Sequence, residues 1–403
     1  MIDPAGADRA VLRDLELEWR SQRLPAYRRL VDSYKGVPLP PTLAGRMDLI
    51  GQVARAAGQY LWFFAATGGA AWKMELVLAR FWRRHLAPAL ATRQEQGLYD
   101  GGGYQVLLGG LAPALPARVD HAVYSLDWYH PTAGEEPGPA VPSAGDFRSA
   151  AAAAAAANRR RAAEEACRSI LEDSRRLRRF DRLLAVAQHY ALLREEQVRD
   201  FTLGWPLLRR CAAEIGKQLE QAGIINSPDD VYFLTKQDLR LDAPPQQDNV
   251  AGRRQDWLRQ RKLAAPLVLG GLPMFGNTFD RVANTARSTA NLPHGALVGH
   301  PASPGRARGR VRIVEGPGDF AQFQPGEVLV TRATAPAWTP LFAQAAAVVT
   351  DGGNLAAHAS LVAREYGIPA VVGTGTATQV LRTGQLVTVD GNAGTIETHG
   401  DCR

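Results

Sequence analysis

The chain has 403 residues, of which 46% are apolar and 22% are charged. This composition is typical of a globular protein and gives enough length for two or three domains with buried cores. The formal net charge is +7, from 47 basic and 40 acidic side chains, but the basic residues are spread along the chain and often stand beside acids. Nucleic-acid binders usually cluster their positive charge on one face, so we expect no nucleic-acid partner.

Cysteine use and hydropathy argue against two further classes of protein. Cys167, Cys211 and Cys402 lie far apart, without the spacing of a disulfide framework or a zinc site. The most apolar stretch, residues 60–72, is interrupted by glycines and is shorter than the ~20 residues that span a membrane. Residues 1–20 are charged and lack the apolar core of a signal peptide. We therefore expect a cytoplasmic chain with no membrane partner.

The first part of the chain has the pattern of a helical domain. Residues 9–130 carry apolar side chains at helical spacing, with few β-branched runs. Residues 131–145 are rich in proline and glycine, which predicts a loop. An alanine run at 150–157 then opens a periodic stretch that continues to Gly223 and predicts two or more long helices.

The pattern changes towards the C-terminus. Residues 235–295 are polar and interrupted by proline and glycine, which predicts a connector with one short helix around 253–262. Beyond it, short β-branched runs surround one helical segment, His358–Tyr366. We predict a multidomain chain: an all-α domain at 1–295 followed by a small α/β domain at 296–403. The expected strands are residues 310–314, 327–331, 347–350, 370–373, 386–390 and 394–397.

One segment has a pattern that indicates chemistry. A buried strand is expected to end at Gly352 and Gly353, and a helix to open at His358 and close at Gly367. The free N–H groups and the positive dipole end of a helix N-terminus favour a dianionic group, such as a phosphorylated imidazole. Two glycines leave room for another chain or a nucleotide phosphate to approach. The alternative is that His358 only caps a helix or fills a polar surface position, and we interpret the other seven histidines in that way.

Residues 348–373 resemble the phosphohistidine signature of the swivelling domain in the PEP-utilising enzyme family, as in PEP synthase, pyruvate phosphate dikinase and rifampicin phosphotransferase. The matching positions keep the family's order and spacing. Pro301–Gly305 resembles the opening of that domain, and Thr331–Phe342 resembles the strand and turn beside its histidine. The resemblance covers about residues 296–397. The matching residues are Gly352, Gly353, His358, Ala359, residues 362–365 and residues 367–373.

The resemblance implies a role for each matching residue. His358 would be the nucleophile that carries the phosphoryl group. Gly352, Gly353, Thr334, Ser360 and Arg364 would support the transfer. The family usually has serine or threonine before the histidine, where this chain has Ala357. Arg364 would pair with the phosphoryl group or form a solvated salt bridge with Glu365 or a neighbour.

Residues 150–240 resemble, more loosely, the helical substrate-binding domain of the rifampicin phosphotransferase type, which implies a pocket for a small apolar acceptor. Such a site needs a base for the accepting hydroxyl and cations for the phosphoryl oxygens. A solvated helix face explains the available residues equally well. The candidates are His189, Arg194, Glu195, Arg209, Arg210 and Lys217.

The sequence contains no glycine-rich phosphate loop before residue 296, and no carboxylate cluster that indicates a metal site. We therefore expect ATP and Mg²⁺ on a separate ATP-grasp partner, with this chain binding neither alone. The predicted function is a phosphotransferase component that moves a phosphoryl group from ATP through His358 to the acceptor. Two alternatives stay open. One is a synthetase component that condenses or dehydrates the phosphorylated acceptor, and the other is a non-catalytic binding module.

Overall fold

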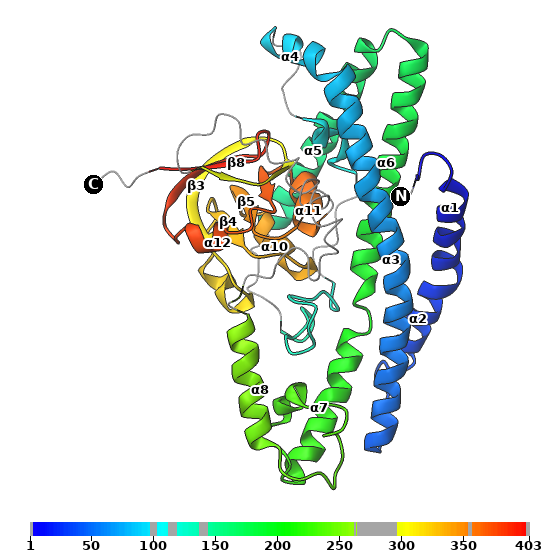
Figure 1. Ribbon diagram of the computed structural model, residues 1–403, viewed down its shortest axis with the longest axis vertical. Coiled ribbons are helices and arrows are strands. Elements are labelled where there is room, and N and C mark those ends of the chain that lie inside the picture. The colour runs from blue at the N-terminus through cyan, green and yellow to red at the C-terminus, as the bar shows by residue number, and fades with distance from the viewer. Residues whose placement is uncertain are drawn as a thin grey trace, which may run out of the picture.

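The computed structural model describes residues 3–96, 103–111, 119–136, 144–261, 263, 296–353 and 357–399. Long helices lie side by side in an extended array, and a compact domain that contains the β-sheet packs against its flank (Figure 1). We call residues 3–261 the helical part and residues 296–399 the C-terminal domain. Within the described ranges, no helix has both the length and the apolar character that a membrane crossing requires.

Two antiparallel helices, α3 and α6, form the centre of the helical part. The Tyr60 hydroxyl of α3 donates to the Gln197 carbonyl of α6 at 2.9 Å, and further along the pair Phe81 stacks on Phe180. Proline or glycine stands at or near several helix ends, as expected. The helices are α1 (Arg9–Glu18), a π-helix η1 (Trp19–Arg23), α2 (Leu24–Asp32), α3 (Leu43–His85), α4 (Ala87–Glu95), a 3-10 helix η2 (Tyr104–Leu108), α5 (Ala144–Ile170), α6 (Ser174–Phe201), α7 (Trp205–Gln221), a 3-10 helix η3 (Pro228–Phe233) and α8 (Gln247–Gln260).

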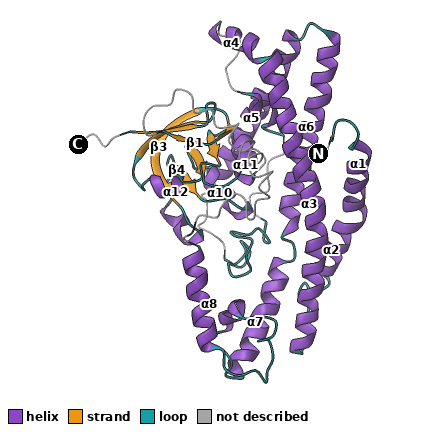
Figure 2. Cartoon of the chain, viewed as in Figure 1, coloured by secondary structure: helices purple, strands orange, loops and turns teal. Residues whose placement is uncertain are grey.

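The C-terminal domain is built on an eight-stranded sheet with the order β1-β8-β7-β3-β4-β5-β6-β2. Its central strands β3, β4, β5 and β6 pair in parallel, and the other pairs are antiparallel. Figure 2 shows the strands in orange. Strands buried on both faces favour runs of valine and alanine, and β4, β5 and β6 are buried throughout. The strands are β1 (Leu297–Val298), β2 (His300–Ser303), β3 (Arg306–Ile313), β4 (Val328–Thr331), β5 (Ala347–Thr350), β6 (Ala370–Val372), β7 (Leu386–Asp390) and β8 (Thr395–Thr398).

Short helices complete this domain. The 3-10 helix η4 (Pro317–Gln322) follows β3, and α11 (His358–Tyr366) packs against β2, β5 and β6. The remaining helices are η5 (Pro336–Trp338), α10 (Thr339–Phe342) and α12 (Ala377–Val380). The expected fold class, a helical region followed by a small α/β domain, is confirmed.

Several expected boundaries differ from the structure. Residues 103–136 are not regular helix: η2 is followed, after a gap, by a segment with an isolated bridge between Val123 and Thr132. α5 begins at Ala144, inside the expected loop at 131–145, and α8 covers 247–260 instead of 253–262. Strands β1 and β2 were not predicted, because β1 has only two residues and β2 contains histidine and proline. The expected stretches at 137–143 and 264–295 lie outside the described residues.

Residues 119–136 connect the two parts of the molecule. Tyr124 packs edge-on against Phe320 of the C-terminal domain, with ring centroids 5.5 Å apart. The Trp338 indole donates to the Tyr124 carbonyl at 2.9 Å. Ala122, Tyr124 and Ala133 therefore belong to the same buried cluster as the C-terminal residues, although the expected division placed them in the helical domain.

Candidate functional site

The turn that precedes α11 depends on glycine. Gly353 has φ +99°, in the region that side chains other than glycine rarely adopt. Gly352 does not have positive φ, and its N–H donates to the Arg332 carbonyl at 2.8 Å. α11 then begins at His358, without a side-chain cap from Ala357, and ends at Gly367 with φ +64°. His358 therefore stands in the first turn of the helix, as the sequence predicts.

The imidazole of His358 lies in an enclosed position. Neither ring nitrogen is exposed or has a well-formed hydrogen bond with any described residue. The ring meets Phe342 nearly edge-on, with centroids 6.2 Å apart. Burial and, to a smaller extent, the positive charge of Arg194 lower the pKa of His358 to about 3, while the nearby backbone of Ala335 opposes the shift. The imidazole is therefore neutral near neutral pH, which is its nucleophilic form.

The helical part places a cation near this imidazole. Arg194 of α6 lies with its guanidinium 5.7 Å from the ring centre of Phe64 on α3. Its Nη1 atom is buried and has no hydrogen-bond partner in the described structure. A buried guanidinium N–H without an acceptor is costly. The position of Arg194 therefore provides a free donor group for an anion near His358.

Glu195 follows on the same helix. Burial raises the pKa of Glu195 to about 7, opposed by Arg194 and supported by the charge of Glu365. Its Oε1 atom is buried and accepts no hydrogen bond from the described residues. A carboxyl group with a pKa near neutrality can both accept and return a proton. Glu195 thus lies beside Arg194 in sequence, with its carboxyl within reach of the charge of Glu365 on α11.

The expected supporting residues have different surroundings. Thr334 precedes Ala335, and its Oγ1 atom is buried without a described hydrogen-bond partner. It therefore lies in the loop whose backbone approaches the imidazole. Ser360 is fully buried two residues after His358, and residues two apart on a helix do not share a face. The role of the Ser360 hydroxyl in phosphoryl transfer stays a prediction.

Arg364 has a role that the sequence did not predict. Its guanidinium forms a buried ion pair with Glu75 of α3 at 2.6 Å and donates from Nε to the Ala302 carbonyl at 2.6 Å. The Tyr104 hydroxyl also donates to Glu75, at 3.3 Å. Arg364 is thus held by Glu75, in place of a solvated salt bridge, and joins the C-terminal domain to α3. The only sequence signal for Glu75 was a lone acid in an otherwise apolar stretch.

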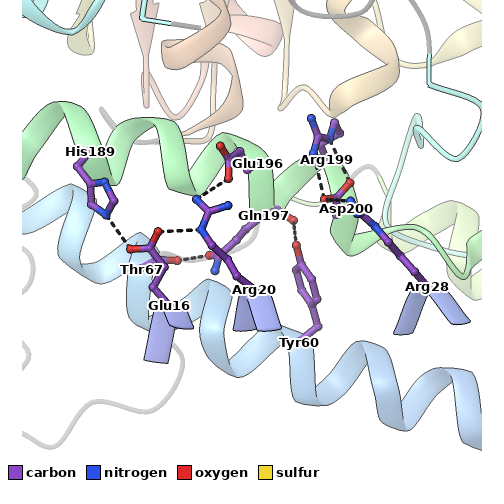
Figure 3. A network of polar contacts seen from close by, with 10 residues as sticks. All are labelled: Glu16, Arg20, Arg28, Tyr60, Thr67, His189, Glu196, Gln197, Arg199 and Asp200. Atoms are coloured by element: carbon purple, nitrogen blue, oxygen red, sulfur yellow. Dashed lines mark hydrogen bonds and ion pairs between the residues drawn. The ribbon is translucent and has the colours of Figure 1, made fainter. Parts of the chain in front are cut away.

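The remaining acceptor candidates lie elsewhere. His189 faces α1, where its Nε2 atom is 2.8 Å from Glu16, and the same network includes Arg20 (Figure 3). This partner raises the pKa of His189. Arg209 holds Glu135 at 2.9 Å, Arg210 donates to the Tyr34 and Val37 carbonyls, and Lys217 pairs with Glu214 at 2.8 Å. Of the six candidates, the structure thus directs only Arg194 and Glu195 towards the C-terminal domain.

No metal centre is recognisable in the described ranges, which contain no group of three or more His, Cys, Asp or Glu side chains arranged to hold an ion.

Comparisons with known proteins point to the same region. Residues 323–394 match the mobile domain of PEP-utilising enzymes. The chain is 38% identical over 191 residues to an uncharacterized phosphotransferase, YvkC, of Bacillus subtilis. The aligned region covers 45% of this chain and 22% of that protein. It is 35% identical over 188 residues to a rifampicin phosphotransferase of Bacillus subtilis, covering 45% and 20%. A chondramide synthase of Chondromyces crocatus is 34% identical over 238 residues, covering 54% and 6%. The chain thus spans about a fifth of the two phosphotransferases and less of the synthase.

Proposed function

Because its C-terminal domain carries the mobile domain of PEP-utilising enzymes, we propose that this chain is the carrier and acceptor-binding component of a phosphotransferase. ATP and Mg²⁺ are bound by a separate ATP-grasp protein, which phosphorylates His358. The C-terminal domain then docks on the helical part and delivers the phosphoryl group to a small apolar acceptor. The nucleotide's metal ion neutralises phosphate charge during the first transfer.

One observation supports this proposal most strongly. Docking brings the neutral imidazole of His358 close enough to Arg194 for that charge to lower its pKa, and a donor atom of Arg194 is left without a partner in the described residues. Mobile-domain similarity alone explains a histidine at a helix start. It does not explain a buried guanidinium nitrogen without a described partner near that histidine. A phosphoryl group on the imidazole satisfies that guanidinium.

The second transfer uses residues of both parts. The acceptor hydroxyl oxygen attacks phosphorus, the new P–O bond forms, and the bond between phosphorus and the His358 ring nitrogen breaks. Glu195 takes the hydroxyl proton, and the ring nitrogen takes a proton from water as the phosphoryl group leaves. Glu195 then releases its proton to water, which restores both groups. Arg194 binds the phosphoryl oxygens throughout. The products are the phosphorylated acceptor and neutral His358, so protons and charge balance.

An apolar acceptor agrees with the surroundings of Arg194. Phe64 of α3 lies beneath the guanidinium, and Phe201 of α6 stacks on Phe64 with ring centroids 6.3 Å apart. Both rings are only partly buried. Aromatic side chains beside a few polar groups are the common lining of small-molecule sites. We propose that the acceptor lies against these rings with its hydroxyl towards Glu195.

A second candidate function is a step within a synthase, in which the phosphorylated acceptor is an activated intermediate. The match to chondramide synthase, which covers 54% of this chain, favours keeping this possibility. The two functions differ in the fate of the phosphate. A phosphotransferase leaves it on the product, whereas a synthase releases it as the intermediate condenses or dehydrates.

Radiolabelled ATP tests the proposal. The full chain is incubated with the nucleotide, Mg²⁺ and each ATP-grasp protein encoded beside it. The expected result is acid-labile, base-stable label on the chain that is absent from His358→Ala. His189→Ala is the matched control and should keep the label, since that histidine faces α1. Label that persists in His358→Ala contradicts the proposal, and a chain that never takes label supports a non-catalytic binding module.

A further inference from the structure

A cavity of about 310 Å³ lies on the seam between the helical part and the C-terminal domain. This volume is at the lower end of the range for small-molecule sites, ~300 to 1,000 Å³. One wall comes from the end of α4, η2 and α5, and the other from the loop after β2, the end of α11 and the turn between β7 and β8. The site described above uses none of these residues except Arg364, which only anchors the seam.

Two polar atoms at this cavity lack partners. Ser303 is fully buried, and its hydroxyl makes no hydrogen bond with the described residues. Gln105 is 3% exposed and donates through Nε2 to the Pro301 carbonyl at 2.7 Å, but its Oε1 atom accepts nothing from them. Buried polar atoms in native proteins are nearly always satisfied, so such atoms at a cavity indicate a missing ligand or water.

The charge around the cavity is positive. Arg159 of α5 lines it, is exposed to solvent, and has no ion pair or side-chain hydrogen bond among the described residues. Arg364 is neutralised by Glu75, and no acidic side chain is among the lining residues. Asn392, whose Oδ1 accepts from the Gly305 N–H at 3.2 Å, has an amide group that is a further possible donor. Donor groups thus outnumber acceptors in this space.

We propose that this cavity binds a small oxyanion, the phosphate or carboxylate group of a metabolite-sized ligand. Arg159 supplies the charge-assisted hydrogen bonds from the helical part, and Ser303 and Asn392 donate from the C-terminal domain. Gln105 accepts from a hydroxyl or amine elsewhere on the ligand. Because the walls belong to different parts of the chain, the ligand binds the docked arrangement better than the undocked one and shifts the equilibrium towards docking.

Inorganic phosphate and acetate are suitable probes. Each is titrated by calorimetry into the full-length His358→Ala variant, in which binding at the imidazole cannot contribute. The ionic strength is held constant with chloride. We expect saturable binding of at least one anion. Arg159→Ala should weaken it about tenfold or more, the loss of a charged hydrogen-bond donor. Ser303→Ala should weaken it without lowering the midpoint of thermal unfolding.

The matched control is Arg161→Ala, an exposed arginine of the same helix that does not line the cavity. It should leave the affinity unchanged. Saturation by phosphate alone assigns the site to phosphate groups, and saturation by both anions to oxyanions in general. No saturable binding, or equal affinity in Arg159→Ala, overturns the proposal. Binding lost in Arg194→Ala but kept in Arg159→Ala also overturns it and leaves the proposed phosphoryl transfer intact.

Discussion

Burial moves the pKa values of His358 and Glu195 away from their usual ranges in opposite directions. The charged form of each group is disfavoured, so the pKa of the imidazole falls to about 3 and that of the carboxyl rises to about 7. Near neutral pH the imidazole of His358 is uncharged. The carboxyl of Glu195 is then present in both its protonated and its ionised form. Arg194 lowers both values, but desolvation is the larger cause for each.

Replacing Glu195 should separate the two transfers. In Glu195→Gln the base for the acceptor hydroxyl is absent, so transfer from phosphorylated His358 to an acceptor should slow by about 100- to 10,000-fold. Phosphorylation of His358 itself should persist. Rapid-quench measurement of label leaving the chain checks this, with the neighbouring Glu196→Gln as control, since Glu196 pairs with Arg20 instead. Equal rates in both variants would refute the role of Glu195.

The same carboxyl predicts a pH dependence. Glu195 accepts a proton only when ionised, so the transfer rate should rise with pH through about 7 and then level off. Single-turnover rates across this range measure the profile. The inflection near 7 should disappear in Glu195→Gln, and its survival would assign it to another group.

At the scale of the element, α11 and its flanking strands could be predicted from sequence, whereas the working face of α6 could not. β-branched runs identified β5 and β7, and His358 and Gly367 bounded α11 as expected. α6 is different because polar residues stand on more than one face. His189 and Glu196 face the α1 network (Figure 3). Arg194 lies close enough to His358 of the C-terminal domain for its charge to lower the pKa of that imidazole. Only packing of the two parts distinguishes these faces, and sequence periodicity carries no information on it.

The turn before α11 gives a prediction at this scale. Gly353→Ala forces a side chain into a left-handed conformation, φ +99°, and should destabilise the domain by about 1–2 kcal/mol. Gly352→Ala is the matched control, since its φ is not positive and an added Cβ would lie 3.2 Å from the Arg332 carbonyl oxygen. Urea unfolding of both variants measures the difference. If Gly352→Ala loses as much free energy of unfolding as Gly353→Ala, lack of space for a side chain, and not the backbone conformation, accounts for the glycines.

At the scale of the whole molecule, the contacts that hold the docked arrangement also limit how readily the C-terminal domain leaves it. The buried pair of Arg364 and Glu75 and the packing of Tyr124 against Phe320 must both break. A carrier domain needs docked and undocked states of similar free energy. The sequence predicted the two parts and the histidine. It did not predict this seam, because Glu75 and Arg364 are 289 residues apart and long-range pairing leaves no local pattern.

Breaking the buried pair should have a large effect. Arg364→Met leaves Glu75 buried without its cation and should destabilise the docked structure by about 3–5 kcal/mol. The double variant Glu75→Leu/Arg364→Met should recover most of that loss. Burial already raises the pKa of Glu75, so the penalty in Arg364→Met should shrink as the pH falls and Glu75 takes up a proton. Urea unfolding at two pH values tests both expectations. An Arg364→Met variant as stable as the wild type would contradict them.

The central claim is that His358 carries a phosphoryl group. The most direct measurement is tandem mass spectrometry of the full chain after treatment with phosphoramidate, a small-molecule donor that phosphorylates histidine without an enzyme. Peptides are prepared at alkaline pH to preserve the N–P bond. The account predicts one phosphoryl group on the His358 imidazole, which is lost when a competent acceptor is added and is absent from His358→Ala. An unmodified His358 in a chain whose exposed histidines, such as His189, are phosphorylated would contradict it.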